Sequence, residues 1–395
     1  MGGFECSTHQ WRDGRRLDLI AATAHDRFAR EDYERVQQYG LRIVRDGIRW
    51  HLIERPAGQY TFAADLPLVR AALRTGTQVI WDLCHYGWPD DLSPFAPEFG
   101  RRLAGLARAF IRLLIEEGEA RPLVVPINEI SFLSWIGGTE GKFPPFATGR
   151  GDELKRCLVR ATIECIDAVR EVAPHARICI IDPMINVAGR CRDRDDQRRA
   201  EEYRLSQYRA WDMLAGRAAP ELGGKPEYLD IVGVNYYVHN QWLHAGHGEF
   251  VRMLRPSDPG YRPVWDLLRE VYERYRRPLF IAETGIEGRR RPRWLRHIAD
   301  ETARALSAGV PVEGICLYPI VDYPGWADER HCPAGLLGYP DEAGCRPAYP
   351  PLARELARQR VRFECWHRPR PGRPGPARLD VVPRPVPDPS CRAAS

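Results

Sequence analysis

Short apolar segments alternate with longer helix-like segments along most of the chain, and this alternation restricts the possible folds more than any other feature. Several of the short segments are rich in Val and Ile and end at Gly, Pro or charged residues, as buried parallel strands do. The predicted strands are Leu19–Ala24, Ile43–Ile48, Gln78–Leu83, Leu123–Ile127, Ile178–Ile181, Leu229–Val234, Pro278–Ala282 and Val312–Leu317. The predicted helices are Arg30–Tyr39, Leu66–Arg74, Glu98–Glu117, Asp152–Val172, Glu201–Leu214, Val264–Tyr275, Arg293–Ala308 and Tyr349–Gln359. Eight strands alternating with eight helices predict a closed (β/α)8 barrel of the TIM type.

An open, doubly wound sheet is the alternative α/β architecture. Such a sheet rarely has eight evenly spaced units, and no GxGxxG motif follows the first predicted strand. We therefore predict an N-terminal extension at residues 1–16, a single barrel domain at residues 17–362 and a disordered tail at residues 366–395. Pro and Arg dominate that tail, so no apolar face can form there. The charged segment Gly189–Arg199 is predicted to be a solvated loop before a helix, with a binding segment as the alternative.

The composition argues against several functional classes. The net charge is only +5 and the Arg runs are short, so we expect no nucleic-acid binding. The 11 Cys are scattered without paired CxxC motifs, and the N-terminus lacks the apolar core of a secretory signal. No stretch is apolar enough to span a membrane. These features predict a reduced, cytoplasmic protein, and the absence of metal-ligand spacing predicts that it needs neither metal nor cofactor.

Two glutamates follow predicted strands on opposite sides of the barrel. The fourth strand ends in PINEI, with Asn128 and Glu129, and the seventh ends in IAETG, with Glu283. Catalytic residues of such barrels lie at the carboxyl ends of the strands, where the loops converge. Glycoside hydrolysis requires two carboxyl groups, one to donate a proton and one to attack or to activate water. Two solvated glutamates without a catalytic role are the alternative.

The second and third strands contribute polar and aromatic candidates. Arg45 lies inside the apolar segment IVRDGIRW, and a buried Arg needs an anionic partner. That partner is either the ionised nucleophile or a structural acid such as Asp46. The third strand continues into CHYGWP, where His85, Tyr86 and Trp88 offer a polar group and flat apolar surfaces for a sugar ring. A buried histidine with a structural role is the alternative for His85.

The sixth and eighth strands also end in amide and aromatic side chains. The sixth ends in VNYY, with Asn235 and Tyr237, and the eighth leads into Tyr318 and Trp326. Each of these residues alone could serve packing. Together they predict a mouth that binds a carbohydrate rather than a phosphorylated ligand.

The two glutamate motifs resemble those of family 1 glycoside hydrolases, the retaining β-glucosidase and β-galactosidase type. PINEI is similar to that family's TFNEP motif, which implies that Glu129 is the acid/base and that Asn128 holds the sugar's 2-hydroxyl. IAETG is similar to its ITENG motif, which implies that Glu283 is the nucleophile. The resemblance covers residues 17–360, and the order of the motifs makes it specific.

Three further motifs extend the resemblance. VRDGIRW is similar to YRFSISW, which implies that Arg45 lies beside the nucleophile. CHYGWP is similar to YHWDLP, which implies that His85 contacts a sugar hydroxyl. VGVNYY is similar to IGINYY, which implies that Tyr237 contacts the nucleophile.

The sequence departs from the family where the sugar is recognised. The family's Glu-Trp pair after the eighth strand is replaced by Gly325-Trp326, and the eighth-strand Trp by Tyr318. Its first-strand Gln has no counterpart in AATAHDR, the segment predicted to follow the first strand. The catalytic residues thus match those of the family, whereas the residues that bind the sugar differ from them. A 6-deoxy or otherwise modified sugar is one substrate that the missing Glu suggests.

The resemblance implies retaining hydrolysis of a β-glycoside through two displacements, with Glu283 as nucleophile and Glu129 as acid and then base. The alternatives are a catalytically inactive carbohydrate-binding barrel and a transglycosidase with the same residues. A module of a larger sugar-processing assembly, tethered by the Arg/Pro tail, is a further alternative.

Overall fold

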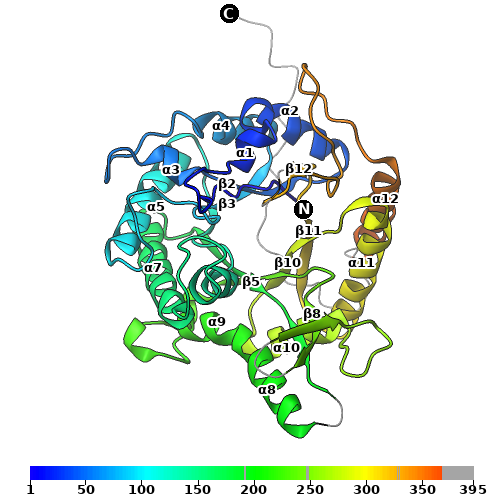
Figure 1. Cartoon of the computed structure of the whole chain (residues 1–395). Coiled ribbons are helices and arrows are strands. Elements are labelled where there is room, and N and C mark those ends of the chain that lie inside the picture. Colours follow the sequence, from blue (N-terminus) through cyan, green and yellow to red (C-terminus); the bar gives the residue numbers. More distant parts are fainter. Residues whose placement is uncertain (191–192, 246–248, 327, 329, 367–395) are drawn as a thin grey trace, which may run out of the picture.

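A closed barrel of eight parallel strands forms the centre of the computed structural model, which describes residues 1–190, 193–245, 249–326, 328 and 330–366. The strands follow one another around the barrel, and the last pairs with the first. They are β1 (Gly2–Gly3), β2 (Ile43–Gly47), β3 (Gln78–Asp82), β4 (Leu123–Val125), β5 (Arg177–Pro183), β7 (Ile231–Asn235), β10 (Leu279–Thr284) and β11 (Val312–Leu317). Helices surround the barrel (Figure 1). The predicted (β/α)8 fold is confirmed.

Most helices follow the strands as the amphipathic segments predicted, but the predicted helix Glu201–Leu214 is divided between two helices, Arg194–Leu205 and Arg209–Leu214. The long ones are α2 (His25–Gln38), α4 (Leu66–Thr75), α5 (Glu98–Glu116), α7 (Gly151–Val172), α8 (Arg194–Leu205), α10 (Val264–Tyr275), α11 (Arg291–Ser307) and α12 (Pro350–Trp366). Shorter ones are α1 (Leu19–Ala22), α3 (Trp50–Ile53), α6 (Ile130–Leu133), α9 (Arg209–Leu214) and a π-helical segment (Ser134–Thr139). Within the described residues, no helix combines the length and the apolar character that crossing a membrane requires.

The first predicted strand is wrong. Leu19–Ala22 forms the short helix α1, whose first turn is capped by the Asp18 carboxylate. The first barrel strand is instead Gly2–Gly3, and a Cβ at Gly3 would lie 2.1 Å from the Tyr318 ring. A strand of two glycines has no apolar run that periodicity could detect. Residues 1–16, predicted as an extension, therefore supply β1 and the loop after it.

Two segments were predicted to lack regular structure, the charged segment and the Pro-rich tail, and the structure describes most of the first but almost none of the second. The segment Gly189–Arg199, predicted as a loop, contains the start of α8, where Asp193 accepts hydrogen bonds from the N–H groups of Asp195 and Asp196. A solvated helix carries charge on most faces, so charge alone could not exclude a helix. The predicted tail starts at the last residue of α12, and residues 367–395 lie outside the described residues.

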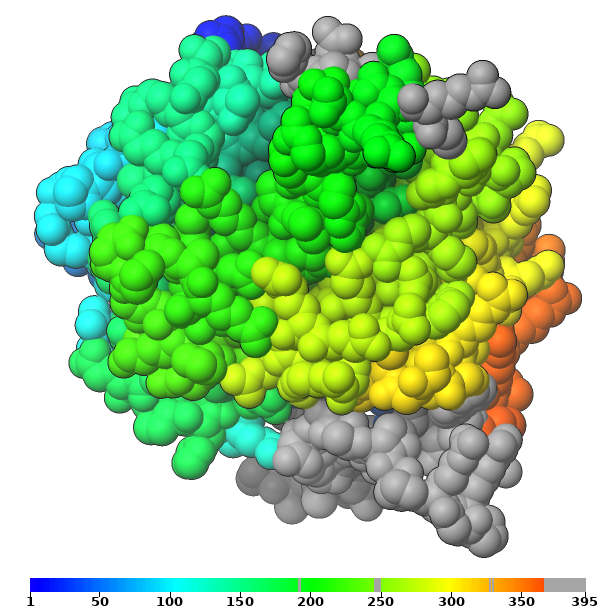
Figure 2. All heavy atoms as spheres, turned by 90° about the horizontal axis from the view of Figure 1, so that it is seen from below, coloured from blue at the N-terminus to red at the C-terminus, as the bar shows by residue number. Residues whose placement is uncertain are grey.

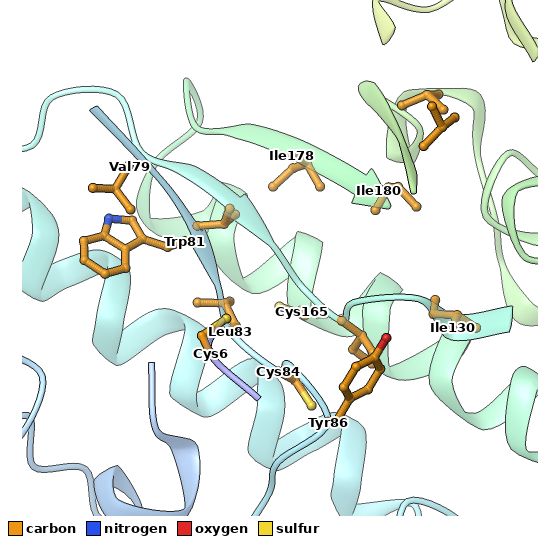
Figure 3. Packing of buried hydrophobic residues seen from close by; sticks show 14 of the residues in the cluster. Cys6, Val79, Trp81, Leu83, Cys84, Tyr86, Ile130, Cys165, Ile178 and Ile180 are labelled. Atoms are coloured by element: carbon orange, nitrogen blue, oxygen red, sulfur yellow. The ribbon is translucent and has the colours of Figure 1, made fainter. Parts of the chain in front are cut away.

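Side chains on each barrel strand alternate between the interior and the surrounding helices. The interior core comprises Ile80, Leu123, Val125, Cys179, Ile181, Ile231, Phe280 and Ala282. Val79 and Trp81 belong instead to the outer core between the barrel and the helices, and Figure 3 shows both side chains beside β3. The same alternation separates the neighbours Arg45 and Asp46, so they serve different networks.

A small sheet lies on the mouth side of the barrel. Its strands are β6 (Asn186–Ala188), β8 (Gln241–Ala245) and β9 (Glu249–Met253). Since β6 and β8 directly follow the carboxyl ends of β5 and β7, this sheet and α8 sit above the strand ends. The green atoms of α8 project from the upper end of the molecule in Figure 2. A second small sheet pairs β12 (Tyr323–Pro324) with β13 (His331–Cys332) after β11.

Outside the barrel, a buried charge network joins α2 to β2. His25 lies between two carboxylates, with Nδ1 2.7 Å from Asp32 and Nε2 2.7 Å from Asp46. The Tyr33 hydroxyl donates to Asp46, and the buried Arg346 guanidinium pairs with Asp32. Burial alone would lower the pKa of His25, but the two carboxylates outweigh it and raise the pKa to about 9. The imidazolium therefore neutralises charge that would otherwise be buried without compensation.

Replacing His25 with alanine is expected to lower the free energy of unfolding by about 3–5 kcal/mol, because it leaves the buried Asp46 without a cation, whereas Asp32 keeps Arg346. The pKa of His25 is about 6.5 in the unfolded chain and higher in the fold. The stabilisation is thus complete below about pH 6.5 and is lost as the pH rises toward the folded-state pKa. Urea denaturation at several pH values measures this difference, with His175→Ala, an exposed position, as control. A loss that is small or independent of pH would show that the network does not need the cation.

Candidate active site

Glu283 is held in the barrel mouth by two donors. Arg45 Nη1 lies 2.6 Å from one carboxylate oxygen, and the Tyr237 hydroxyl lies 2.8 Å from the other. The pairing of β10 with β7 shifts register between Ile281 and Glu283. Such an irregularity redirects a side chain, and here it lets Glu283 enter the site although Ala282 already faces the interior. Both carboxylate oxygens are thereby occupied and oriented.

Arg45 organises the floor of the site. Its guanidinium is fully buried and donates to both oxygens of Asp82, at 3.0 Å and 2.6 Å, as well as to Glu283. Nη2 also donates to the Asn128 side-chain oxygen at 2.7 Å. The Tyr318 ring covers the guanidinium at 5.3 Å. Arg45 thus has the anionic partners that a buried cation needs, and Asp46 is not among them.

Glu129 has a different environment. It follows β4 with a left-handed backbone (φ 48°), a conformation that non-glycine residues adopt mainly where the surrounding structure imposes it. Its carboxyl accepts hydrogen bonds from the Asn235 amide at 2.9 Å and from the Tyr86 hydroxyl. Burial, together with the negative charge of Glu283, raises the pKa of Glu129 to about 8. This raised pKa favours the protonated form of Glu129, which is the form that a general acid requires.

His85 connects the floor to the acid/base side. Its Nδ1 lies 2.6 Å from Asp82, and its Nε2 lies 3.2 Å from the Asn128 amide nitrogen. Burial lowers the pKa of His85, but the Asp82 carboxylate outweighs burial and raises it. The ring stacks parallel to Tyr318 at 6.0 Å. Asn128 is thereby fixed between Arg45, His85 and Tyr86.

An aromatic wall stands next to Glu129. The Trp326 ring packs against Phe143 at 5.6 Å, Tyr86 at 5.5 Å and Phe132 at 6.5 Å. Farther out, Trp135 is 42% exposed on the π-helical segment and contacts Phe132. This wall offers flat apolar surfaces on the side of Glu129.

The structure brings nearly all predicted site residues together. Those that converge on the mouth are Glu129, Glu283, Arg45, His85, Asn128, Asn235, Tyr237, Tyr318 and Trp326. Trp88 does not join them, because it is buried against Phe99 at 5.7 Å. The chain reverses at Tyr86 (φ 63°), and Gly87 packs on Thr8, so Trp88 points into the outer core instead.

Two site residues, Asp82 and Glu5, were not recognised from the sequence, and for a third, the candidate Tyr86, the contact with Glu129 was not predicted. Asp82 ends the apolar third strand and has the pattern of an ordinary strand terminus. Tyr86 follows His85 directly, but only the turn at this position sends its hydroxyl toward the segment that carries Ile130 (Figure 3). Glu5 follows the undetected first strand. An acidic residue inside the apolar third segment was the one available signal, since a buried Asp needs a partner as much as a buried Arg does.

Among the described residues, Cys6, Asp82 and His85 form a group whose ligand atoms lie within 4.8 Å of one another. Three such side chains could contribute to a metal site. However, Asp82 already accepts hydrogen bonds from Arg45 and pairs with His85, and the Arg45 cation is adjacent. Burial and the Asp82 charge also raise the pKa of the Cys6 thiol, which opposes the thiolate form that binds metals. This group is therefore suited to supporting Arg45.

No family model and no curated protein matches the sequence. Solved structures do share its fold. The β-glucosidase from Thermotoga maritima in complex with glucoimidazole is 18% identical, with 86% of this chain and 87% of that chain covered and a TM-score of 0.71. The β-glycosidase from the hyperthermophile Thermosphaera aggregans is 17% identical over 85% and 86% of the chains, with a TM-score of 0.72. The AHE enzyme from Alicyclobacillus herbarius is 18% identical over 86% and 88%, with a TM-score of 0.72.

The family 1 β-glucosidase fold that the motifs indicated is thus confirmed, because a family 1 β-glucosidase from Thermotoga maritima superposes with a TM-score of 0.70 at 18% identity. Similarity at this level of identity establishes the fold. Activity has to be argued from the site itself.

Proposed function

We propose that the protein is a retaining β-glycoside hydrolase in which Glu283 is the nucleophile and Glu129 the acid/base. The observation that carries this proposal is the contrast between two glutamates in one buried site. Glu283 is paired with the Arg45 guanidinium and accepts a hydrogen bond from the Tyr237 hydroxyl. Among the described residues no basic group pairs with Glu129, and its pKa is raised to about 8. Two carboxyl groups with such different partners can divide the roles of nucleophile and acid.

In the first step, a Glu283 oxygen attacks the anomeric carbon as the bond to the leaving oxygen breaks. Glu129 transfers its proton to that oxygen, so the aglycone departs as a neutral alcohol. Arg45 and Tyr237 orient the attacking carboxylate, while Asn128 and His85 face the sugar. The aromatic wall beside Glu129 lies on the side from which the aglycone leaves.

In the second step, water attacks the glycosyl ester. Esterification removes the negative charge of Glu283, so the pKa of Glu129 falls and its carboxylate accepts a proton from the water. The sugar is released with its original anomeric configuration, and Glu283 returns as a carboxylate. Transglycosylation would replace this water with another hydroxyl and use the same residues.

The test is covalent trapping of the full chain with activated 2-fluoro β-glycosides that include 6-deoxy sugars, followed by peptide mass spectrometry. We expect an adduct on Glu283 and none on Glu129, and no adduct in a Glu283→Gln variant. Folded protein that binds sugars but forms no adduct with any of them would favour the inactive carbohydrate-binding barrel. An added alcohol acceptor then distinguishes hydrolysis from transglycosylation by its products.

Replacing Tyr86 with phenylalanine is expected to shift the pH profile of kcat/KM. The Tyr86 hydroxyl stabilises the ionised form of Glu129, so its removal raises the pKa of Glu129 above about 8. Since the protonated acid is the active form, the alkaline limb of the profile moves to higher pH. The ring contacts with Trp326 and Phe143 are preserved. Tyr39→Phe at the end of α2 serves as control, and an unchanged or lowered alkaline limb would contradict the assignment.

A further inference from the structure

The Glu5 carboxyl lies at the floor of the site without a clear structural duty. Glu5 is 5% exposed and comes directly after Gly3 and Phe4 at the start of the first loop. One of its oxygens accepts the backbone N–H of Ser7 at 3.0 Å and lies 3.8 Å from His85 Nε2, beyond hydrogen-bond distance. From the residues that the structure describes, the other oxygen accepts no hydrogen bond. Most buried side-chain polar atoms in folded proteins have a hydrogen-bond partner, so this second oxygen is open to a donor from a ligand.

Glu5 extends a row of polar groups across the floor. His85 Nε2 lies 3.2 Å from the Asn128 amide on one side and 3.8 Å from Glu5 on the other. The hydroxyls of Tyr86, Tyr237, Tyr318 and Tyr323 also lie within electrostatic range of the Glu5 carboxyl. Because Arg45 contacts both Asn128 and Glu283, this row of contacts connects Glu5 with the nucleophile candidate.

The floor of the site contains more carboxyl groups than basic side chains. Glu5, Asp82, Glu129 and Glu283 face Arg45 and His85, and both basic groups are already paired with Asp82 or Glu283. Burial raises the pKa of Glu5 to about 7, with His85 opposing and Glu283 adding to the shift. A hydrogen-bond donor from a ligand would stabilise the Glu5 carboxylate, whereas a ligand anion would face uncompensated negative charge.

We propose that Glu5 is a sugar-recognition residue that accepts hydrogen bonds from hydroxyl or ammonium groups of the sugar attacked by Glu283. The substrate class is a glycoside whose sugar presents donors at this position and carries no phosphate, sulfate or carboxylate there. This inference rests on the proposed function, since it assumes that a sugar occupies the space next to Glu283. Under this proposal Glu5 contributes to the choice of sugar, for which the residues after the eighth strand differ from those of the family.

The experiment compares wild type, Glu5→Gln and the exposed control Glu342→Gln. Substrates are a neutral aryl β-glycoside, its monodeoxy analogues, and amino and phosphorylated counterparts. We expect Glu5→Gln to lower kcat/KM for the best substrate about 10- to 100-fold, as loss of a charged hydrogen bond does. The loss should disappear for the one deoxy analogue that lacks the group facing Glu5, because effects at a shared contact are not additive. Comparison of the amino and neutral substrates distinguishes an ammonium from a hydroxyl.

Two results would overturn the inference and leave the proposed function intact. One is an equal loss on every substrate, which indicates a purely structural Glu5, and the other is a phosphorylated sugar as the best substrate. The case in which the inference holds but hydrolysis fails is tested by titration calorimetry with Glu129→Gln protein. If sugars bind without turnover and Glu5→Gln weakens that binding, the inference stands although hydrolysis fails. Absence of both binding and cleavage across the panel overturns both. If the Glu5→Gln protein does not fold, kcat/KM of the wild-type protein for the monodeoxy analogues still shows which sugar hydroxyl contributes to recognition.

Discussion

Replacing Glu283 with glutamine is expected to reduce kcat by a factor on the order of 10⁴ or more, the largest effect that we expect of any single substitution in this protein. The amide has nearly the same shape but cannot form the glycosyl ester, so the double displacement cannot begin. The measurement is the steady-state rate on the glycoside identified by trapping. The exposed residue Glu273 on α10 supplies a matched Glu→Gln control with unchanged activity.

The Glu283→Gln variant is also expected to change the pKa of Glu129. The negative charge of Glu283 helps to raise the pKa of Glu129 to about 8, so glutamine at position 283 should lower that pKa toward its ordinary value. Titration of Glu129 by NMR in both proteins checks this shift without any need for activity. A variant that retained a tenth of the wild-type rate would show that another group, such as Glu5, is the nucleophile.

Replacing Glu129 with glutamine is expected to lower kcat/KM about 10²- to 10⁴-fold for glycosides with poor leaving groups. Alkyl alcohols need the proton of Glu129 in order to leave, because their conjugate bases are strong. Nitrophenolates leave without it, so kcat/KM for activated aryl glycosides should fall far less. Deglycosylation still lacks its base, and the glycosyl ester should accumulate on Glu283.

Small anions provide the decisive test for the Glu129 variant. Azide needs no base, so it should restore turnover and yield a glycosyl azide of retained configuration. Glu140→Gln, which alters a residue paired with Lys142 at the surface, is the control. Equal losses for good and poor leaving groups, with no rescue by azide, would mean that Glu129 only positions the substrate.

The seven later strands could be predicted from sequence because a parallel strand buried on both sides must be apolar almost throughout. The helices were predictable for a related reason, since one face of each packs on the barrel and repeats every 3.6 residues. Val264–Tyr275 and Val312–Leu317 have the predicted bounds. Polar residues at the ends of such strands stand out, and for that reason Glu129, Glu283 and Arg45 could be recognised as candidates.

Several parts of the site were decided by contacts between distant segments. The first strand is two glycines, and the Tyr318 ring lies so close to Gly3 that a side chain would not fit there, a contact that has no local signature in the sequence. The direction of each side chain also depended on tertiary structure. The turn at Tyr86 places that residue on Glu129 and sends Trp88 into the outer core.

The chain by itself therefore determined the barrel and the two glutamates, since both follow from the polarity of successive residues. Tertiary structure decided which groups surround them. The irregular pairing at β10 turns Glu283 toward Arg45, and the closure of β1 against β11 brings Glu5 to the floor beside His85. Protonation states follow from these placements, because the pKa of a buried carboxyl depends on the charges and donors that the fold assembles around it.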